Sequence, residues 1–250
     1  MSTGVQTAVG RFVWHDHISA DPETARKFYA ELLGWQTEIW KTGDLVYPMI
    51  SVDGEAHGGF GRAPEGAPSN WLAHALVTDV DEGVLNVEAS GGRVIEPAMD
   101  LPDVGRMAVV SDPQGAVFSL FAAVGEAPTA RGVFVWDELV TTDIAAAKTF
   151  YRDVFGWEAR DVDGLTGPYT LFRSGETDRA GGMQRRADMT EVPPHWMSYL
   201  AADDVDTTLA RAGGLGAHTA FGPVDIPDQG RIAVLIDPTG AAFGLFKSSH

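Results

Sequence analysis

The chain has 250 residues, of which 44% are hydrophobic and 21% are charged, a balance typical of folded globular proteins and unlike that of disordered chains. Its 35 acidic and 18 basic residues give a net charge of −17, which argues against a nucleic-acid-binding protein because such a protein needs a basic surface. The sequence has no cysteine, which excludes disulfides, thiolate catalysis and cysteine-ligated zinc sites.

The first ten residues lack the cationic start and apolar centre of a signal peptide. No apolar run in the sequence approaches the length of a membrane span. We therefore expect a cytoplasmic protein, a monomer or homodimer, whose partner is a small-molecule ligand and neither a nucleic acid nor a membrane.

The first half predicts a strand, a helix and three strands, and then the same order again. Asp21 is a typical N-cap for the first helix, and Gly34 is a typical stop. A weaker helix follows later and ends at a Gly-Gly pair. In chain order we expect strand 11–19, helix 22–33, strands 35–40, 46–52 and 57–62, strand 70–78, helix 81–90, and strands 93–97, 105–111 and 116–122.

The second half repeats the first. The Phe-Val-Trp run at residues 12–14 returns at residues 134–136, an offset of 122. The Asp-Pro turn at residues 112–113 returns at residues 237–238, an offset of 125. Two colinear copies indicate a duplicated domain. We expect one domain at residues 1–123, a linker at residues 124–131 and a second domain at residues 132–250.

Two motifs occur in both halves. One is a strand, a helix-capping Asp, a Phe-Tyr pair and a Gly-Trp pair, and the other is an Asp-Pro-x-Gly turn followed by Phe-x-Leu-Phe. In these motifs the chain resembles the vicinal oxygen chelate superfamily, which includes glyoxalase I, bleomycin-resistance proteins and extradiol dioxygenases. The resemblance implies an α+β tandem duplication, in which four βαβββ units form two cup-shaped mixed β-sheet domains with flanking helices.

The resemblance also implies where metal ligands would lie in the metal-dependent members of the superfamily. A divalent metal needs imidazole or carboxylate donors, and the residues at those positions supply neither. We therefore expect no metal and no other cofactor in either cup, although a different site that uses His15, His17, His57 and His74 stays open. The positions counted from the capping aspartates and turn glycines are Trp14, Leu72 and Ser119 in the first half and Trp136, Met197 and Gly244 in the second.

Strand alternation predicts which side chains face each cup. If Trp14 faces the cup, Phe12 and Asp16 do so as well, whereas His15 and His17 face the helices. His74 is on the same face as Leu72, and its counterpart in the second half is Tyr199. The full set of candidate ligand-binding residues is Phe12, Trp14, His57, Arg106, Ser119, Trp136, Glu138, Tyr199 and Arg231.

Trp14 and Asp16 have two interpretations. They form an aromatic wall with a carboxylate that holds a cation or hydroxyl, or the tryptophans are core residues and the acids pair with Arg106 and Arg231. Both interpretations stay open for the tryptophans. For Asp16 and Glu138 we favour ligand binding, because an acid on an otherwise apolar strand is costly to bury.

Two functions from different classes fit these residues. The first is metal-independent binding of an aromatic or cationic natural product, by sequestration or as antibiotic resistance. The alternative is a cofactor-independent isomerase, lyase or cyclase of a small oxygenated metabolite, in which Asp16 and His74 form a catalytic acid–base pair. Whether the chain is an enzyme therefore stays open. A third hypothesis is an interaction protein whose cups are filled by its own side chains.

Overall fold

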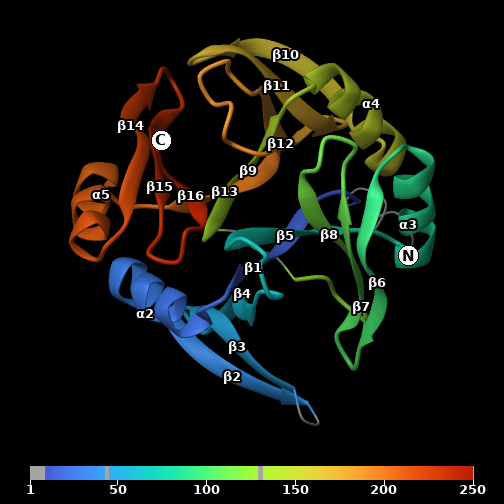
Figure 1. Ribbon diagram of the computed structural model, residues 1–250, viewed down its shortest axis with the longest axis horizontal. Coiled ribbons are helices and arrows are strands. Elements are labelled where there is room, and N and C mark those ends of the chain that lie inside the picture. The colour runs from blue at the N-terminus through green and yellow to red at the C-terminus, as the bar shows by residue number, and fades with distance from the viewer. Residues whose placement is uncertain (1–8, 43–44, 129–131, 250) are drawn as a thin grey trace. The chain divides into compact units, whose positions relative to one another are not determined.

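The structure is a computed structural model and describes residues 9–42, 45–128 and 132–249. Its elements follow the order β-α-β-β-β four times, twice in each half of the chain (Figure 1). This order confirms the duplicated α+β architecture. The predicted linker extends into residues 129–131, which lie outside the described residues, as do residues 1–8. No helix in the described ranges is long and apolar enough to cross a membrane.

The elements of the first half agree with prediction except near β6. That strand continues four residues beyond its predicted end at Pro97, because it is the last strand of its sheet and its pairing with β7 is irregular there. An edge strand tolerates proline, which cannot donate a ladder hydrogen bond. The first half comprises β1 (Phe12–Ser19), α2 (Pro22–Leu33), β2 (Gln36–Thr42), β3 (Leu45–Val52), β4 (Glu55–Arg62), β5 (Asn70–Leu76), α3 (Val80–Ala89), β6 (Arg93–Leu101), β7 (Gly105–Ser111) and β8 (Val117–Ala123).

The second half has the same elements in the same order. It comprises β9 (Phe134–Thr141), α4 (Ile144–Phe155), β10 (Glu158–Gly164), β11 (Gly167–Ser174), β12 (Thr177–Gln184), β13 (His195–Ala201), α5 (Val205–Gly214), β14 (His218–Ile226), β15 (Gly230–Ile236) and β16 (Ala242–Ser248).

Local chemistry sets both ends of α2 and α4. The Asp21 carboxylate accepts the backbone N–H of Thr24 at 3.2 Å, and Asp143 accepts that of Ala146 at 3.0 Å. Each bond satisfies a donor that the first helical turn leaves without a backbone partner. Gly34 ends α2 at a φ of 73°, a left-handed conformation that glycine adopts without steric cost.

Each half forms one eight-stranded mixed sheet. The strand order is β2-β3-β4-β1-β5-β8-β7-β6 in the first sheet and β10-β11-β12-β9-β13-β16-β15-β14 in the second. β1 pairs with β4 in parallel, and β5 pairs with β8 in parallel, whereas the hairpins are antiparallel. The shared strand order confirms that the two halves have one topology.

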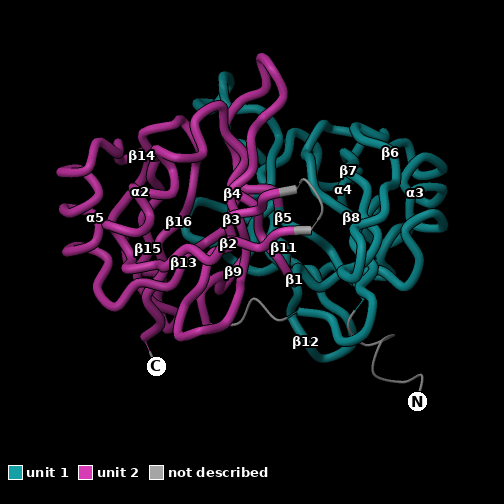
Figure 2. The backbone as a smooth tube through the Cα atoms, turned by 90° about the horizontal axis from the view of Figure 1, so that it is seen from below, with its two compact units in different colours: residues 1–13, 73–128, 137–196 teal, residues 14–72, 129–136, 197–250 magenta. Residues whose placement is uncertain are grey.

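The compact units of the structure do not coincide with the halves of the sequence (Figure 2). Unit 1 consists of residues 1–13, 73–128 and 137–196, and unit 2 consists of residues 14–72, 129–136 and 197–250. Each unit therefore combines helices from both halves: α3 contacts α4 in unit 1, and α2 contacts α5 in unit 2.

The same aromatic cluster forms the centre of each unit. In unit 1 the buried Tyr151 stacks on Trp157 at a centroid distance of 5.6 Å and meets Trp196 edge-on at 5.3 Å. In unit 2 Tyr29 stacks on Trp35 at 5.4 Å and meets Trp71 edge-on at 5.2 Å. Such ring pairs stabilise a core beyond the area they bury.

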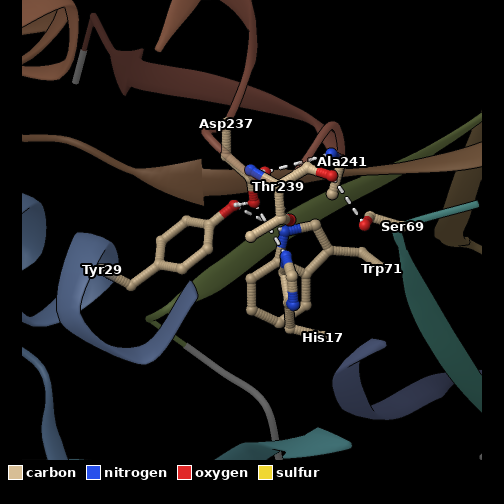
Figure 3. A network of polar contacts seen from close by, with 7 residues as sticks. All are labelled: His17, Tyr29, Ser69, Trp71, Asp237, Thr239 and Ala241. Carbon is tan, nitrogen blue, oxygen red and sulfur yellow. Dashed lines mark hydrogen bonds and ion pairs between the residues drawn. The ribbon is translucent and has the colours of Figure 1, made fainter. Parts of the chain in front are cut away.

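A buried polar network lies within the unit 2 cluster (Figure 3). Asp237 is in the turn between β15 and β16, and its Oδ2 accepts the Tyr29 hydroxyl at 3.0 Å and lies 2.7 Å from His17 Nε2. The indole of Trp71 donates to the Tyr29 hydroxyl at 3.0 Å. Buried polar groups need such partners, because an unpaired one retains the full cost of its desolvation. His17 therefore faces α2, as the alternation of its strand predicts.

Unit 1 has the same network with one exchange. The Tyr151 hydroxyl donates to Asp112 Oδ2 at 3.2 Å, and the indole of Trp196 donates to Tyr151 at 2.9 Å. At the offset of 122, Leu139 occupies the place of His17, and it is completely buried. The chain thus carries two versions of one network, one with an imidazole beside the carboxylate and one with an apolar side chain.

The replacement of histidine by leucine beside the carboxyl group shifts the pKa values of Asp237 and Asp112 in opposite directions. Burial alone would raise the pKa of Asp237, but the hydrogen bond and charge of His17 lower it below the ordinary value. Burial raises the pKa of Asp112 in spite of hydrogen bonds from Ala116 and Gly115. Ionised Asp237 therefore stabilises the fold above about pH 4, and this contribution is lost as the pH falls through its folded pKa. The contribution of Asp112 has the opposite sign: it is present below about pH 4 and is lost as the pH rises through its folded pKa.

Replacement of His17 by leucine, the residue of the other network, should lower the free energy of unfolding by about 2–4 kcal/mol at neutral pH. The difference from the wild type should shrink below about pH 4, because protonation of Asp237 then removes its contribution to the stability of the wild type as well. Urea unfolding across this pH range measures it, with His218→Leu at the exposed start of β14 as the control. A difference that stays constant with pH would contradict this account of the network.

Candidate functional site

Three side chains of unit 2 form a hydrogen-bonded group, here called the Trp14 cluster: Trp14 and Asp16 on β1, and Tyr47 on β3. The Trp14 indole donates to the Tyr47 hydroxyl at 2.8 Å and to Asp16 Oδ1 at 3.1 Å. The Tyr47 hydroxyl in turn donates to Asp16 Oδ1. All three are partly exposed, and they lie on the face of β1 that is turned away from α2. The structure thus brings the predicted Trp14 and Asp16 together.

A glycine makes room for this arrangement. Gly59 on β4 is opposite Asp16 on one side and opposite Met49 on the other. A Cβ atom at residue 59 would overlap the Tyr47 hydroxyl and ring. Only glycine therefore lets the phenol cross β4 and reach the carboxylate.

The Tyr47 phenol is the protonated donor of the cluster. Burial raises the pKa of Tyr47 above its usual range, and the charge of Asp16 raises it further, so the phenol keeps its proton and acts as the donor. Donated hydrogen bonds favour the ionised form of a carboxyl group. The indole and the phenol are therefore the neutral donors of the cluster, and the Asp16 carboxyl group is the acceptor.

The second half repeats the residue types of the cluster, with Trp136 in unit 2 and Glu138 and Tyr169 in unit 1. Trp136 and Glu138 on β9 and Tyr169 on β11 follow the first set at the offset of 122. Glu138 is opposite Gly181, as Asp16 is opposite Gly59. Our sequence analysis missed Tyr47 and Tyr169, although a comparison of the two halves shows their recurrence.

His74, Ser119 and His57 are buried. In unit 1, His74 on β5 is opposite Ser119 on β8, and their exposed fractions are 3% and 0%. The Ser119 hydroxyl donates to the backbone oxygen of Leu120 at 3.1 Å. His57 lies on β4 beside an irregularity in its pairing with β3. His74 belongs to unit 1 and Asp16 to unit 2, and their pairing stays a prediction.

The structure places Phe12 in the apolar core of unit 1. Its exposed fraction is 7%, and its ring meets Trp196 edge-on at a centroid distance of 5.0 Å and Trp157 at 6.3 Å. Its surroundings are therefore those of a core residue, although the alternation of β1 alone assigns it to the face of Trp14.

Arg106 and Arg231 form matching ion pairs. Arg106 binds Asp81 at 2.9 Å and Asp100 at 2.7 Å. Arg231 binds its two aspartates in the same way, Asp206 at 2.7 Å and Asp225 at 2.8 Å. These hydrogen bonds raise the pKa of both guanidinium groups further above their usual value. In each case one carboxylate belongs to the first turn of a helix, so both arginines are directed toward α3 and α5.

Tyr199 covers a position that the superfamily resemblance associates with a metal-binding carboxylate. In unit 2, Tyr199 on β13 is opposite Gly244 on β16. A Cβ atom at residue 244 would overlap the Tyr199 ring. Tyr199 is 5% exposed and belongs to an apolar cluster. The other members of this cluster are Met197, Ile232, Trp136, Phe221, Val224, Ile226, Val234 and Phe246.

The donors present do not fit a divalent metal at the positions that the resemblance implies. Trp14, Met197 and Gly244 offer neither an imidazole nor a carboxylate. Within residues 9–42, 45–128 and 132–249, no three His, Asp or Glu side chains are grouped closely enough to hold a metal ion. The ring of His15 stacks on Phe134 at 4.0 Å, and His17 is bound to Asp237. The residues at these positions therefore do not support a metal-dependent reaction there.

A cavity of about 340 Å³ in unit 1 is lined by residues of α4, β11 and β12 and by Asp161 of β10. Lys148 and Asp161 form an ion pair of 2.6 Å in its wall. None of the predicted site residues lines it.

A family model described as a glyoxalase-like domain matches residues 13–121 and again residues 134–246. The chain therefore belongs to the glyoxalase-like domain family, in its tandem form, within the vicinal oxygen chelate superfamily.

Two relatives align along nearly their whole length. CFP32 of Mycobacterium bovis, named as a candidate glyoxylase, is 37% identical over 245 residues, which cover 94% of this chain and 93% of that protein. The anthracycline biosynthesis protein DnrV of Streptomyces peucetius is 35% identical over 262 residues, which cover 96% and 94%.

Solved structures share the fold at low identity. The Mn(II)-bound glyoxalase of Novosphingobium aromaticivorans superposes with a TM-score of 0.66 at 17% identity and covers 96% of this chain and 82% of its own. The 2,3-dioxygenase LapB of Pseudomonas superposes at 0.64 with 14% identity and covers 97% and 94%. These similarities establish the fold alone.

Substitution of Gly244 by alanine should destabilise the protein by about 1–3 kcal/mol, because the added methyl group overlaps the Tyr199 ring. The double variant Tyr199→Ala/Gly244→Ala should lose less than the sum of the single variants, because the ring is gone. Urea unfolding measures each value, with Gly213→Ala in α5 as the control because its Cβ meets open space. Additive losses would show that the ring does not cover Gly244.

Proposed function

We propose that this chain is a small-molecule-binding protein that holds an aromatic or cationic natural product at the Trp14 cluster without a metal. The hydrogen-bonded group of Trp14, Tyr47 and Asp16 carries the proposal. It combines aromatic surface with a carboxyl group held by two donors, the features that orient a flat or positively charged ligand. Sequestration or resistance would then be stoichiometric, without turnover.

The named relatives support a ligand of this kind. One relative is named for anthracycline biosynthesis. As a chemical class, anthracyclines join a planar aromatic ring system to an amino sugar. The aromatic part matches the indole and phenol of the Trp14 cluster, and the amine matches its carboxylate. The candidate glyoxylase name of the other relative leaves a catalytic role open as well.

Metal independence rests on the donor chemistry described above. We further propose that the protein works in the cytoplasm as a monomer or homodimer, where a fold without disulfides is stable. Its net charge of −17 supports a role without a nucleic-acid partner.

Trp14→Phe should weaken the binding of daunorubicin, an anthracycline, by about tenfold, because the variant loses indole area and the donor that orients Asp16. Fluorescence titration of the purified protein measures the dissociation constant. Trp136→Phe tests the second half in the same way.

Leu85→Ala on the exposed surface of α3 serves as the control, and its affinity should equal that of the wild type. Treatment with EDTA should leave the wild-type affinity unchanged. Unaltered binding in both tryptophan variants would rule out the proposed site, and a loss of binding after EDTA would rule out metal independence.

A cofactor-independent isomerase, lyase or cyclase is the second candidate. The observation that favours it is His74, a buried imidazole opposite the hydroxyl of Ser119 in paired parallel strands. Histidine is a common general base, and in this candidate function Asp16 would orient the His74 ring.

If this second function holds, His74→Ala should abolish turnover but change ligand affinity by no more than about threefold. The bound compound can be incubated with protein in D₂O and recovered for mass spectrometry, since proton abstraction introduces deuterium. Deuterium uptake that is lost in the variant supports the enzyme. No uptake by the wild type, or equal uptake by both proteins, argues against catalysis by His74.

A further inference from the structure

The cavity of unit 1 has an apolar wall and a polar wall. Ile144 of α4, Pro168 of β11 and Met183 of β12 form the apolar wall. The polar side chains come from the same elements, from β10 and from the chain just after β12. The volume of about 340 Å³ lies at the lower end of the range of small-molecule sites. The cavity can therefore hold a small organic molecule.

The polar wall has an excess of positive charge. Lys148 and Arg186 both line the cavity, and Asp161 is the one acid among the lining residues of the described structure. The rest of the chain is strongly acidic, but salt at physiological concentration screens exposed charges beyond about 8 Å. Close to the wall the two cations therefore dominate, and they attract an anion.

Both cations are held by carboxylates that are more exposed than they are. The Lys148 side chain is 27% exposed and that of its partner Asp161 is 60% exposed. The Arg186 side chain is 36% exposed and that of its partner Asp188 is 69% exposed. Because water competes for exposed carboxylates, such ion pairs are weak. The pairs thus orient the two cations without removing their attraction for a further anion.

The ion pairs also leave hydrogen-bond donors on the wall. Lys148 Nζ lies 2.6 Å and 2.7 Å from the two carboxylate oxygens of Asp161. Arg186 binds Asp188 through Nε at 3.0 Å and one terminal nitrogen at 3.1 Å. An ammonium has three N–H groups and a guanidinium has five. Within the described residues, at least one donor of Lys148 and three of Arg186 stay available to a ligand with acceptor atoms.

Asp161 holds Lys148 in place and is itself held. The Thr170 hydroxyl donates to Asp161 Oδ1 at 2.7 Å. Hydrogen bonds from Lys148 and Thr170 lower the pKa of Asp161, so this carboxyl group is ionised at neutral pH. Asp161 and Thr170 are therefore positioning residues for the Lys148 ammonium, and the Asp161 charge competes with any anion that approaches it.

The first half of the chain forms the same elements without this wall. At the offset of 122, the counterparts of Lys148, Asp161 and Arg186 are Arg26, Ile39 and Pro64. Arg26 binds Glu23 of its own helix at 2.6 Å. The fold itself therefore does not require the polar wall, which is particular to the second half.

We propose that this cavity is a binding site for a small organic carboxylate. The carboxylate group of the ligand meets Lys148 and Arg186, and its apolar part packs on Ile144, Pro168 and Met183. The site lies wholly within unit 1, whereas the Trp14 cluster belongs to unit 2, so this inference does not depend on the proposed function.

Two probes of nearly the same shape test the charge requirement. Cyclohexanecarboxylate is an anion at neutral pH, and cyclohexanecarboxamide is neutral. NMR titration of the full chain should show that the anion binds about tenfold or more tightly than the amide. Acetate should bind more weakly than cyclohexanecarboxylate, because it leaves the apolar wall uncovered.

The two partners of one ion pair should shift this affinity in opposite directions. Lys148→Met should weaken binding of cyclohexanecarboxylate by about fivefold or more, because it removes the cation and leaves the Asp161 charge. Asp161→Asn should strengthen binding by about threefold, because it frees the ammonium while the amide oxygen still accepts from Thr170. General loss of folded protein cannot produce a gain in affinity.

Matched controls change the same charges elsewhere. Lys27→Met removes an exposed cation of α2, and Asp153→Asn removes an exposed acid of α4 that pairs with Arg152. Both should leave the affinity for cyclohexanecarboxylate within about twofold of the wild type. Thermal unfolding of each variant checks that the chain is folded.

Equal affinity for the anion and the amide would overturn the inference, and so would the absence of binding of the anion at millimolar concentration. Weaker binding in folded Asp161→Asn, or equal effects of Lys148→Met and Lys27→Met, would also overturn it. None of these results concerns the binding of daunorubicin, so the proposed function is tested separately.

Discussion

The buried carboxylate of each Asp-Pro turn is the constraint on which the two cores depend. Asp237 is more than two hundred residues from His17 and Tyr29 in sequence, yet it binds both. A buried charge without such partners would be costly, so the turn of one half must meet the first helix and strand of the other half. Asp112 and Tyr151 impose the same requirement in unit 1. Each core is therefore completed by both halves of the chain.

This constraint also determines how rigidly the candidate site is held. β1 carries His17 on one face and Asp16 on the other, so the bond that fixes His17 to Asp237 also fixes the strand that presents Asp16. A binding group is most selective when its support is locked by packing and hydrogen bonds. The Trp14 cluster is thus built on a strand that a buried polar contact anchors, and Tyr47 adds a link to β3.

Local patterns explain why much of the fold could be predicted. Helix caps such as Asp21 and stops such as Gly34 act over one turn, and the duplication is visible as a constant offset. The combination of segments from both halves in each compact unit could not be predicted, because it depends on contacts between residues far apart in sequence. Similarly, the partners of Arg231 are set by the nearness of α5 and β14, and strand alternation alone does not reveal them.

The Trp14 cluster has hydrogen-bond donors to a carboxylate on a sheet where the superfamily resemblance implies metal ligands. A metal neutralises the carboxylates that bind it, and donors to replace those ligands are missing at Trp14, Met197 and Gly244. Asp16 instead receives an indole N–H and a phenol O–H, which stabilise its charge without cancelling it. A fold shared with a Mn(II)-bound glyoxalase and with a 2,3-dioxygenase can therefore carry different side-chain chemistry on the same sheet, and at the Trp14 cluster the difference lies in a few side chains on β1, β3 and β4.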